Sequence, residues 1–133
     1  MKYILMMQFK VAGWKTSNMG TWPPEDIKAN TDFLRRFHAE LAESGELVSH
    51  QGLGGPETMK VVQARKGGAP AITDGPFPES KEFLAGYWII DVDSPERACE
   101  IGARLSALPG RGGEPANIPI EVRPVMSYKS GEV

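Results

Sequence analysis

The sequence predicts an α+β domain in which an antiparallel sheet carries two helices on one face. Three observations support this prediction: an apolar run begins the chain, the longest apolar run lies at residues 83–92, and an amphipathic segment follows each of them. The predicted order of elements is strand, helix, four strands, helix, strand. Apart from one extra β-hairpin, this is the βαββαβ order of the ferredoxin-like class.

The composition is that of one globular domain, which we place at residues 1–127, with a C-terminal tail at 128–133. A formal charge of −2 and a pI near 5.7 argue against a nucleic-acid binder, because such proteins are usually basic. The single cysteine, Cys99, excludes an intrachain disulfide. The apolar runs are too short for a signal peptide or a membrane span, so we expect a cytoplasmic protein without membrane contact.

The chain begins with a strand and a long loop. Residues 3–9 are almost continuously apolar, as in a strand that is covered on both faces. This pattern ends at residues 10–24, where glycines and prolines predict a loop longer than usual. Trp14 and Trp22 lie in this loop. Two interpretations are open: the tryptophans form a lid over a ligand cleft, or they cover the end of a helix.

The first helix is predicted from Pro24 to the Ser44-Gly45 pair. Proline suits the first helical position, and Glu25 and Asp26 place negative charge in the first turn, where the helix dipole favours it. Gly45 can adopt the left-handed conformation that ends a helix. The apolar stripe of this helix consists of Ile27, Leu34, Phe37 and Leu41, with Phe33 at its edge.

Three strands are predicted after this helix. Residues 46–53 alternate in polarity, which places His50 on the face opposite Leu47. Residues 58–65 and 69–73 flank a Lys-Gly-Gly turn and predict the extra hairpin.

The second half of the core repeats the strand–helix–strand pattern. Residues 83–92 form the strongest strand, which should be central, and Ser94 and Pro95 suit the N-cap and the first position of a second helix. A second long loop at 109–119 leads to a last strand at 120–123. Both helices should pack on one face of the sheet, so the other face needs a cover that a second subunit would supply.

The turn at residues 73–82 (Thr-Asp-Gly-Pro-Phe-Pro-Glu-Ser-Lys-Glu) is the most distinctive segment. Asp74 can bond to the backbone that follows it, Gly75 can adopt a positive φ, and the two prolines fix their own φ. We therefore expect a stiff loop that presents Asp74, Glu79 and Lys81 on the rim of the sheet.

Asp74 and His50 are the candidate catalytic residues. A carboxylate beside a partly apolar cleft can act as a general base, although Asp74 could serve only to build its turn. His50 precedes a glycine-rich turn and could face the cleft as a base, or it could be a solvent-facing strand residue. For His38, which flanks the stripe of the first helix, a boundary position with a backbone or carboxylate capping partner is favoured over catalysis.

The candidate substrate-binding residues are Phe77, Glu79 and Lys81 of the turn, with Trp14 and Trp22 of the first loop. Lys81 could pair with an anionic ligand group, but a solvated surface ion pair is favoured for the charged residues.

The remaining reactive residues give structural predictions. The two histidines lack the spacing of metal ligands, so we predict no metal and no cofactor. Cys99 lies at the edge of the second helix's apolar stripe and is predicted to be a packed thiol. Arg123 is predicted to pair with Glu82 or Glu121.

The chain resembles the DGPF-type branch of the YCII-related family, small bacterial proteins of the dimeric α+β barrel superfamily. The resemblance spans nearly the whole chain and rests on residues 73–82, 3–7, 45–48, 52–53, 86–92, Ala98 and 120–125.

This resemblance implies a ferredoxin-like protomer, a homodimer formed through the sheet faces and a cleft lined by the turn. Enzymatic function has been linked to the wider family through a recurring histidine and aspartate. The family histidine lies earlier on the first helix, near Leu34, and the nearest histidine here is His38. Some DGPF-type domains are joined to sigma-factor-like domains, which implies a regulatory connection instead.

Our leading hypothesis is therefore a cofactor-independent, homodimeric enzyme or binder of a small polar or aromatic molecule. The ligand would lie between the sheet and the Trp14/Trp22 loop, with Asp74 as acid/base and His50 or Lys81 assisting. The alternative is a non-catalytic ligand-binding or regulatory module linked to transcription control. A purely structural dimer is a third possibility.

Overall fold

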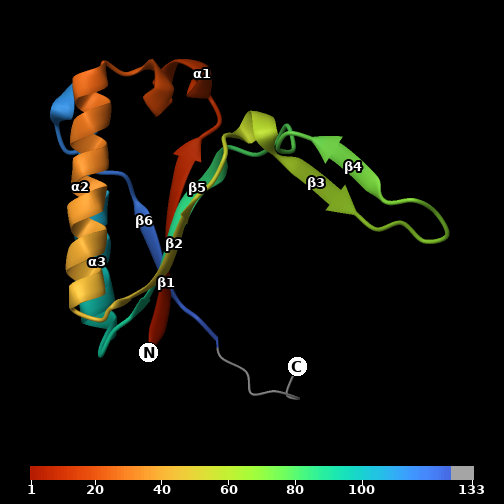
Figure 1. Cartoon of the computed structure of the whole chain (residues 1–133). Coiled ribbons are helices and arrows are strands. Elements are labelled where there is room, and N and C mark those ends of the chain that lie inside the picture. Colours follow the sequence, from red (N-terminus) through yellow and green to blue (C-terminus); the bar gives the residue numbers. More distant parts are fainter. Residues whose placement is uncertain (127–133) are drawn as a thin grey trace.

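The computed structural model describes residues 1–126, and the predicted tail at 128–133 lies outside them. Four strands form one antiparallel sheet in the order β2-β5-β1-β6, and β3 and β4 form a separate hairpin (Figure 1). Without the hairpin this is the strand order of a ferredoxin-like fold, so the predicted fold class is confirmed. The sheet strands are β1 (Lys2–Lys10), β2 (Leu47–Gly52), β5 (Glu82–Asp91) and β6 (Ile120–Pro124).

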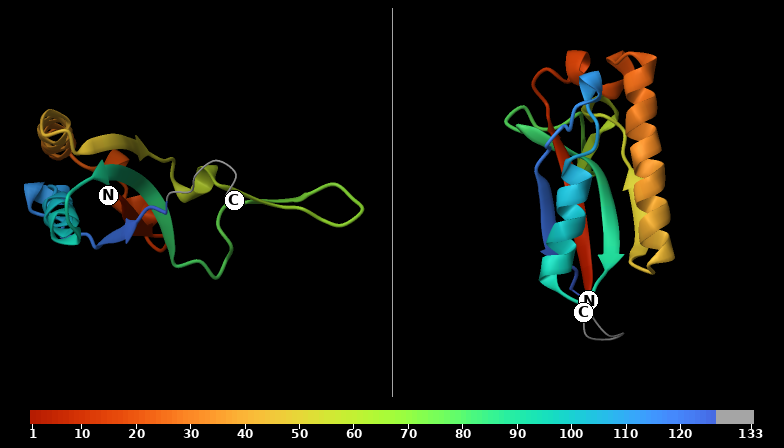
Figure 2. Two further views of the ribbon diagram at one scale, coloured as in Figure 1. Left: turned by 90° about the horizontal axis from the view of Figure 1, so that it is seen from below. Right: turned by 90° about the vertical axis from the view of Figure 1, so that its left-hand side faces the viewer.

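Both long helices, α2 (Pro24–Glu43) and α3 (Pro95–Ser106), cover the same face of the sheet (Figure 2). The core lies between these layers, and its largest fully buried side chains are Leu5, Phe37, Leu41, Ile90, Ile101 and Leu105. Along β1 the buried residues alternate with half-buried ones, because neighbouring side chains of a strand point to opposite faces. None of the helices within residues 1–126 is both long enough and apolar enough to cross a membrane.

The helix ends follow the predicted capping. Pro24 begins α2, and Gly45 follows its end with a φ of 78°. The Ser94 hydroxyl accepts a hydrogen bond from the Arg97 amide at the start of α3. The apolar stripe of α2 also contains two buried polar residues, Asp26 and Asn30, that the sequence pattern did not predict.

A β-bulge in β2 changes the face on which His50 lies. The pairing with β5 shifts between Leu47 and Ser49, so that Leu47 lies opposite Ile90 and His50 lies opposite Trp88. Ile90 and Trp88 both face the core, and His50 therefore shares the helix-covered face with Leu47. The strict alternation predicted for residues 46–53 was wrong at this point.

The hairpin of β3 (Lys60–Gln63) and β4 (Ala71–Asp74) extends away from the sheet. We call residues 60–74 the arm. Figure 1 shows that the arm leaves the upper end of the sheet and points to the side opposite the helices. Its strands are shorter than predicted, because the loop between them spans 64–70 and includes Pro70.

The two long loops lie together over the upper end of the sheet. The first contains α1 (Trp14–Ser17) and a 3₁₀ turn, η1 (Met19–Thr21), and the second contains another, η3 (Arg111–Gly113). Arg111 donates hydrogen bonds to the Thr16 carbonyl and the Thr21 hydroxyl. This side chain joins the two loops into one cover.

Candidate functional site

A cavity of about 570 Å³ lies under this cover, between α2 and the sheet. The first loop contributes Trp14 and Trp22, so the prediction that a cleft lies between the sheet and these tryptophans agrees with the structure. The rest of the wall comes from every layer of the fold: Met7, Phe9, Ser17, Met19, Asn30, Leu34, His38, 50–53, Ala85, Gly86, Trp88, Leu108, Pro109, Ala116 and Ile118.

Aromatic side chains hold the loop side of the cavity in place. The Trp14 ring stacks on Phe9 with centroids 5.7 Å apart and meets the edge of Phe83 at 4.9 Å. The Trp22 indole donates a hydrogen bond to the Ser17 carbonyl at 3.2 Å, which anchors it to α1. Both tryptophans thus line the cavity, and the aromatic partners of Trp14 lie on strands β1 and β5 and not on a helix.

Two polar side chains of α2 hold the second loop over the cavity. Asp26 accepts a hydrogen bond from the Gly112 amide at 2.8 Å, and Asn30 donates one to the Pro109 carbonyl at 2.8 Å. Both are buried, and each satisfies a backbone group that would otherwise lack a partner. Their burial within an apolar stripe is explained by this anchoring.

His38 of α2 and His50 of β2 meet on the cavity wall. Their imidazole rings are stacked, with centroids 3.7 Å apart and an interplanar angle of 16°. His38 is half-buried and His50 is exposed, and both line the cavity. The bulge in β2 is what brings His50 to this face.

A hydrogen bond from Trp88 fixes the tautomer of His38. The Trp88 indole Nε1 lies 2.8 Å from His38 Nε2. Because an indole N–H can only donate, His38 Nε2 must be an unprotonated acceptor, and a neutral His38 carries its proton on Nδ1. The partner of His38 is therefore the indole of a central strand, and not the backbone or carboxylate group that was predicted.

Burial lowers the pKa of His38 from its usual value of 6.5, and the proximity of His50 lowers this pKa further. Both effects favour the neutral imidazole, because charge is costly to bury and like charges repel. His50 has no hydrogen-bond partner for its ring nitrogens among residues 1–126. The pair thus consists of one ring that Trp88 fixes and one ring whose nitrogens have no partner in the described part of the chain.

The cavity wall contains no Lys, Arg, Asp or Glu among the described residues. Its polar groups are the two imidazoles, Ser17, Asn30, Gln51 and backbone atoms. A phosphate or carboxylate inside it would have no cationic partner, so the wall favours an uncharged ligand.

The structure does not bring Asp74 to this cavity. Its side chain is 84% exposed at the base of the arm, and its carboxylate pairs with the Lys60 ammonium at 2.5 Å. Gly75 adopts the predicted positive φ of 76°, so the turn itself forms as expected. The role of Asp74 as acid/base stays a prediction.

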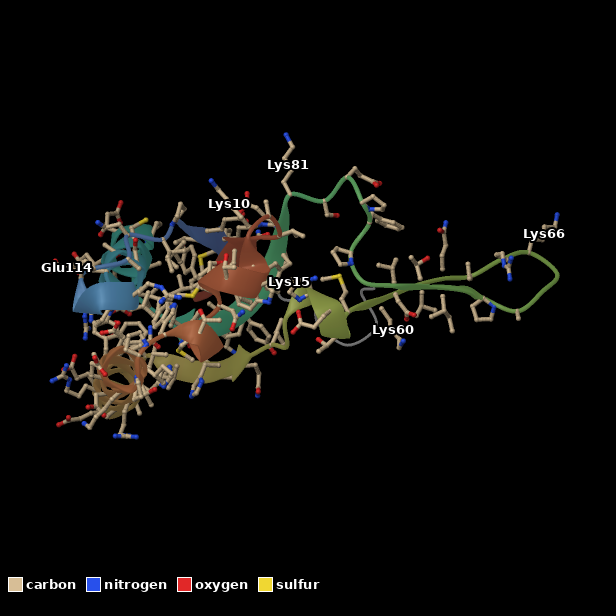
Figure 3. The ribbon with its side chains drawn as sticks, turned by 90° about the horizontal axis from the view of Figure 1, so that it is seen from above. Lys10, Lys15, Lys60, Lys66, Lys81 and Glu114 are labelled. Carbon is tan, nitrogen blue, oxygen red and sulfur yellow. The ribbon has the colours of Figure 1, made fainter. Side chains whose placement is uncertain are left out.

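The other candidates of the turn also lie outside the cavity wall. Phe77, Glu79 and Lys81 are all exposed, and Figure 3 shows Lys81 projecting from the loop into solvent. Of the residues predicted to bind substrate, Trp14 and Trp22 are the two that line the cavity.

Two structural predictions outside the site were wrong. Cys99 is exposed and not packed, because it lies just outside the buried stripe of α3. Arg123 forms no ion pair with Glu82 or Glu121 in the described part of the chain, and Glu121 instead accepts a hydrogen bond from Gln8.

Residues 1–126 contain no group of three or more His, Cys, Asp or Glu side chains that could hold a metal ion.

Comparison with known proteins gives two findings. The family model described as the YCII-related domain matches residues 1–113. An uncharacterised protein of Rhizobium meliloti (strain 1021), R00369, is 35% identical over 112 residues, which cover 84% of this chain and 86% of the relative.

Proposed function

Because the chain belongs to the YCII-related family and two of its histidines line an uncharged cavity, we propose that it is a small-molecule enzyme with His50 as general base. The observation that carries this proposal is the contact sequence Trp88–His38–His50. Trp88 fixes His38, His38 supports the ring of His50, and the nitrogens of His50 are free for a ligand. In the reaction, His50 takes a proton from an acidic O–H or C–H group and becomes an imidazolium.

The ligand class follows from the wall of the cavity. Its volume suits a molecule of one or two rings, and Trp14, Trp22 and Phe9 offer flat apolar surfaces. We propose an uncharged aromatic molecule with one hydroxyl or carbonyl group directed at His50. Deprotonation leaves an enolate or phenolate, and the His50 imidazolium balances its charge.

A binding screen tests this ligand class. All three tryptophans of the chain, Trp14, Trp22 and Trp88, line the cavity, so their fluorescence reports its occupancy. Hydroxylated aromatic compounds should change this fluorescence and raise the melting temperature, and phosphorylated analogues of the same rings should do neither. Preferential binding of the charged analogues would contradict the proposal.

A cavity-filling variant provides the control for that screen. Leu34→Trp places a larger side chain into the cavity and should abolish the rise in melting temperature caused by the ligand. Phe33→Trp alters the neighbouring residue of α2, which lies outside the cavity wall, and should keep the response. Equal responses of both variants would place the ligand elsewhere.

Proton exchange separates the two candidate bases. In D₂O, an active base replaces the acidic C–H of a bound ligand with deuterium, which NMR detects. His50→Gln should slow this exchange by about 100-fold, a typical contribution of a general base. Asp74→Asn should leave it unchanged, since Asp74 lies outside the cavity wall and pairs with Lys60. A loss in Asp74→Asn with none in His50→Gln would return the role to Asp74.

The alternative is a ligand-binding or regulatory module, with the proposed link to transcription control. It is favoured by one observation: the Asp74 carboxylate is paired with Lys60 and is not joined to either histidine. A module of this kind would bind the same neutral ligands. His50→Gln would change its affinity for them, and the wild type itself would catalyse no deuterium exchange of the ligand.

We also propose that the protein is a homodimer formed through the uncovered face of the sheet. On this face Ile4 lies opposite Ile89 and Met6 lies opposite Tyr87. All four residues are only half-buried. We call them the open face. A second copy would bury these side chains, and a twofold axis would bring the same face of each protomer together.

A further inference from the structure

The arm is the part of the described chain that projects furthest from the domain. Figures 1 and 2 show it extending from the end of the sheet on the side opposite α2 and α3, and Figure 3 shows Lys66 at its tip. Its two strands pair only with each other. A hydrogen bond from Arg65 to the Ala69 carbonyl closes the tip.

One face of the arm carries an exposed apolar pair next to the Lys60–Asp74 ion pair. Val62 lies directly opposite Ile72, and these side chains are 62% and 61% exposed. The opposite face of the same strands includes Gln63 and Thr73. Because an isolated two-stranded hairpin is marginally stable in water, the Val62/Ile72 face would gain stability by packing against another surface.

The charge of the arm is opposite to that of the rest of the chain. Residues 60–74 contain Lys60, Arg65, Lys66 and Asp74, which gives a formal charge of +2. The whole chain carries −2, so the remaining residues carry −4. A second copy of the same chain therefore offers the arm a surface of complementary charge.

The direction and length of the arm fit a partner on the open face. The arm extends on the side of the sheet where the open face lies, so any molecule that covers this face lies beside the arm. Each leg of roughly seven residues spans ~23 Å, at ~3.3 Å per residue. Two sheets that pack face to face are about 10 Å apart, so the arm reaches past the partner's sheet.

We propose that the arm clasps a second copy of the chain, with Val62 and Ile72 packed on the flank of the partner. The inference rests on the homodimer of the proposed function and adds to it a second interface, which twofold symmetry makes reciprocal. The dimer is then held by the two open faces and by two arms, one from each protomer.

Sedimentation velocity over a concentration series tests the clasp. The double variant Val62→Asp, Ile72→Asp should raise the dimer Kd by at least about tenfold, since two apolar side chains lose their buried contact. The matched control is Gln63→Asp, Thr73→Asp, which adds the same charge on the opposite face of the same strands. It should raise the Kd by less. Added salt should also weaken the wild-type dimer, because it screens the charge attraction.

The Val62→Asp, Ile72→Asp variant could lose binding because its hairpin misfolds. A second measurement therefore leaves the arm unchanged. Amide hydrogen exchange of residues 60–74 should slow when the protein is concentrated enough to dimerise. In Ile89→Lys, which disrupts the open face, this protection should disappear.

The outcomes separate the arm from the dimer itself. A dimer that Ile89→Lys dissociates, but whose Kd is equal in the wild type and both arm variants, would overturn the clasp and leave the open-face dimer standing. A wild-type protein that stays monomeric at every concentration would overturn both. Exchange of residues 60–74 that is independent of concentration would also contradict the clasp.

Discussion

His38 and His50 are the same residue type in direct contact, yet their surroundings give them different chemistry. His38 is half-buried, and its Nε2 accepts from Trp88. His50 is exposed and lines the cavity, and its ring nitrogens have no hydrogen-bond partner within residues 1–126. We therefore assign His38 a positioning role and His50 the proton transfer.

The lowered pKa of His38 predicts a loss of stability in mild acid. Below pH 6.5 the unfolded chain protonates His38 more readily than the folded chain does, so the free energy of unfolding falls as the pH falls. Above pH 6.5 His38 is neutral in both states, so its protonation no longer changes the free energy of unfolding. In His38→Gln, which can still accept from Trp88, urea unfolding should show a shallower decline between neutral pH and pH 5. An unchanged slope would contradict the assignment.

Glu46 and Arg97 form an ion pair between the start of β2 and the start of α3. Arg97 donates to both carboxylate oxygens, at 2.8 and 2.9 Å, and this lowers the pKa of Glu46 to about 2. Glu46→Gln should lower the free energy of unfolding at pH 7 by about 1–2 kcal/mol. The carboxylate contributes fully above pH 4.5, so the difference from wild type should close as the pH falls toward 2. A difference that stays constant with pH would rule out this explanation.

At the scale of elements, α2 does more than cover the sheet, because it also anchors the loop above the cavity. Asp26→Ala would leave the Gly112 amide without its acceptor and should cost about 1–3 kcal/mol in thermal or urea unfolding. Asp32→Ala on the same helix removes an exposed pair with Lys28 and should cost less than Asp26→Ala does. Equal effects of the two variants would argue against the anchor.

The helix ends could be predicted from the sequence because capping is local. Pro24, Gly45 and Ser94 act within one turn of the helix they delimit, and all three have the predicted role. The bulge after Leu47 could not be predicted, because the register of β2 depends on its pairing with β5. That one shift decides whether His50 faces the cavity, so the contact between His50 and His38 could not be predicted either.

At the scale of the whole molecule, the order of elements predicted the fold but not where Asp74 lies relative to the cavity. Asp74 was expected beside the cleft because the family resemblance implies a cleft lined by its turn. The arm instead leaves the sheet and takes Asp74 to its exposed base. The Trp14/Trp22 side of the cavity was predictable because two tryptophans in a long loop need a surface to pack on.

The open face makes a prediction about the oligomeric state. Ile89→Lys places a charge opposite Ile4, so it should convert a dimer to a monomer while circular dichroism stays unchanged. Size-exclusion chromatography with light scattering measures the mass. Ala107→Lys, at an exposed position after α3, is the matched control and should stay dimeric.

The central claim is that burial favours a neutral His38 and that Trp88 fixes its tautomer, so that His50 is the free base. Long-range ¹⁵N NMR of the histidine rings, recorded between pH 8 and 5, tests it most directly. We predict that His38 has an unprotonated Nε2 and a protonated Nδ1 at neutral pH, and that its protonation occurs below pH 6.5. A His38 ring that is protonated at Nε2, or charged at pH 7, would contradict the account.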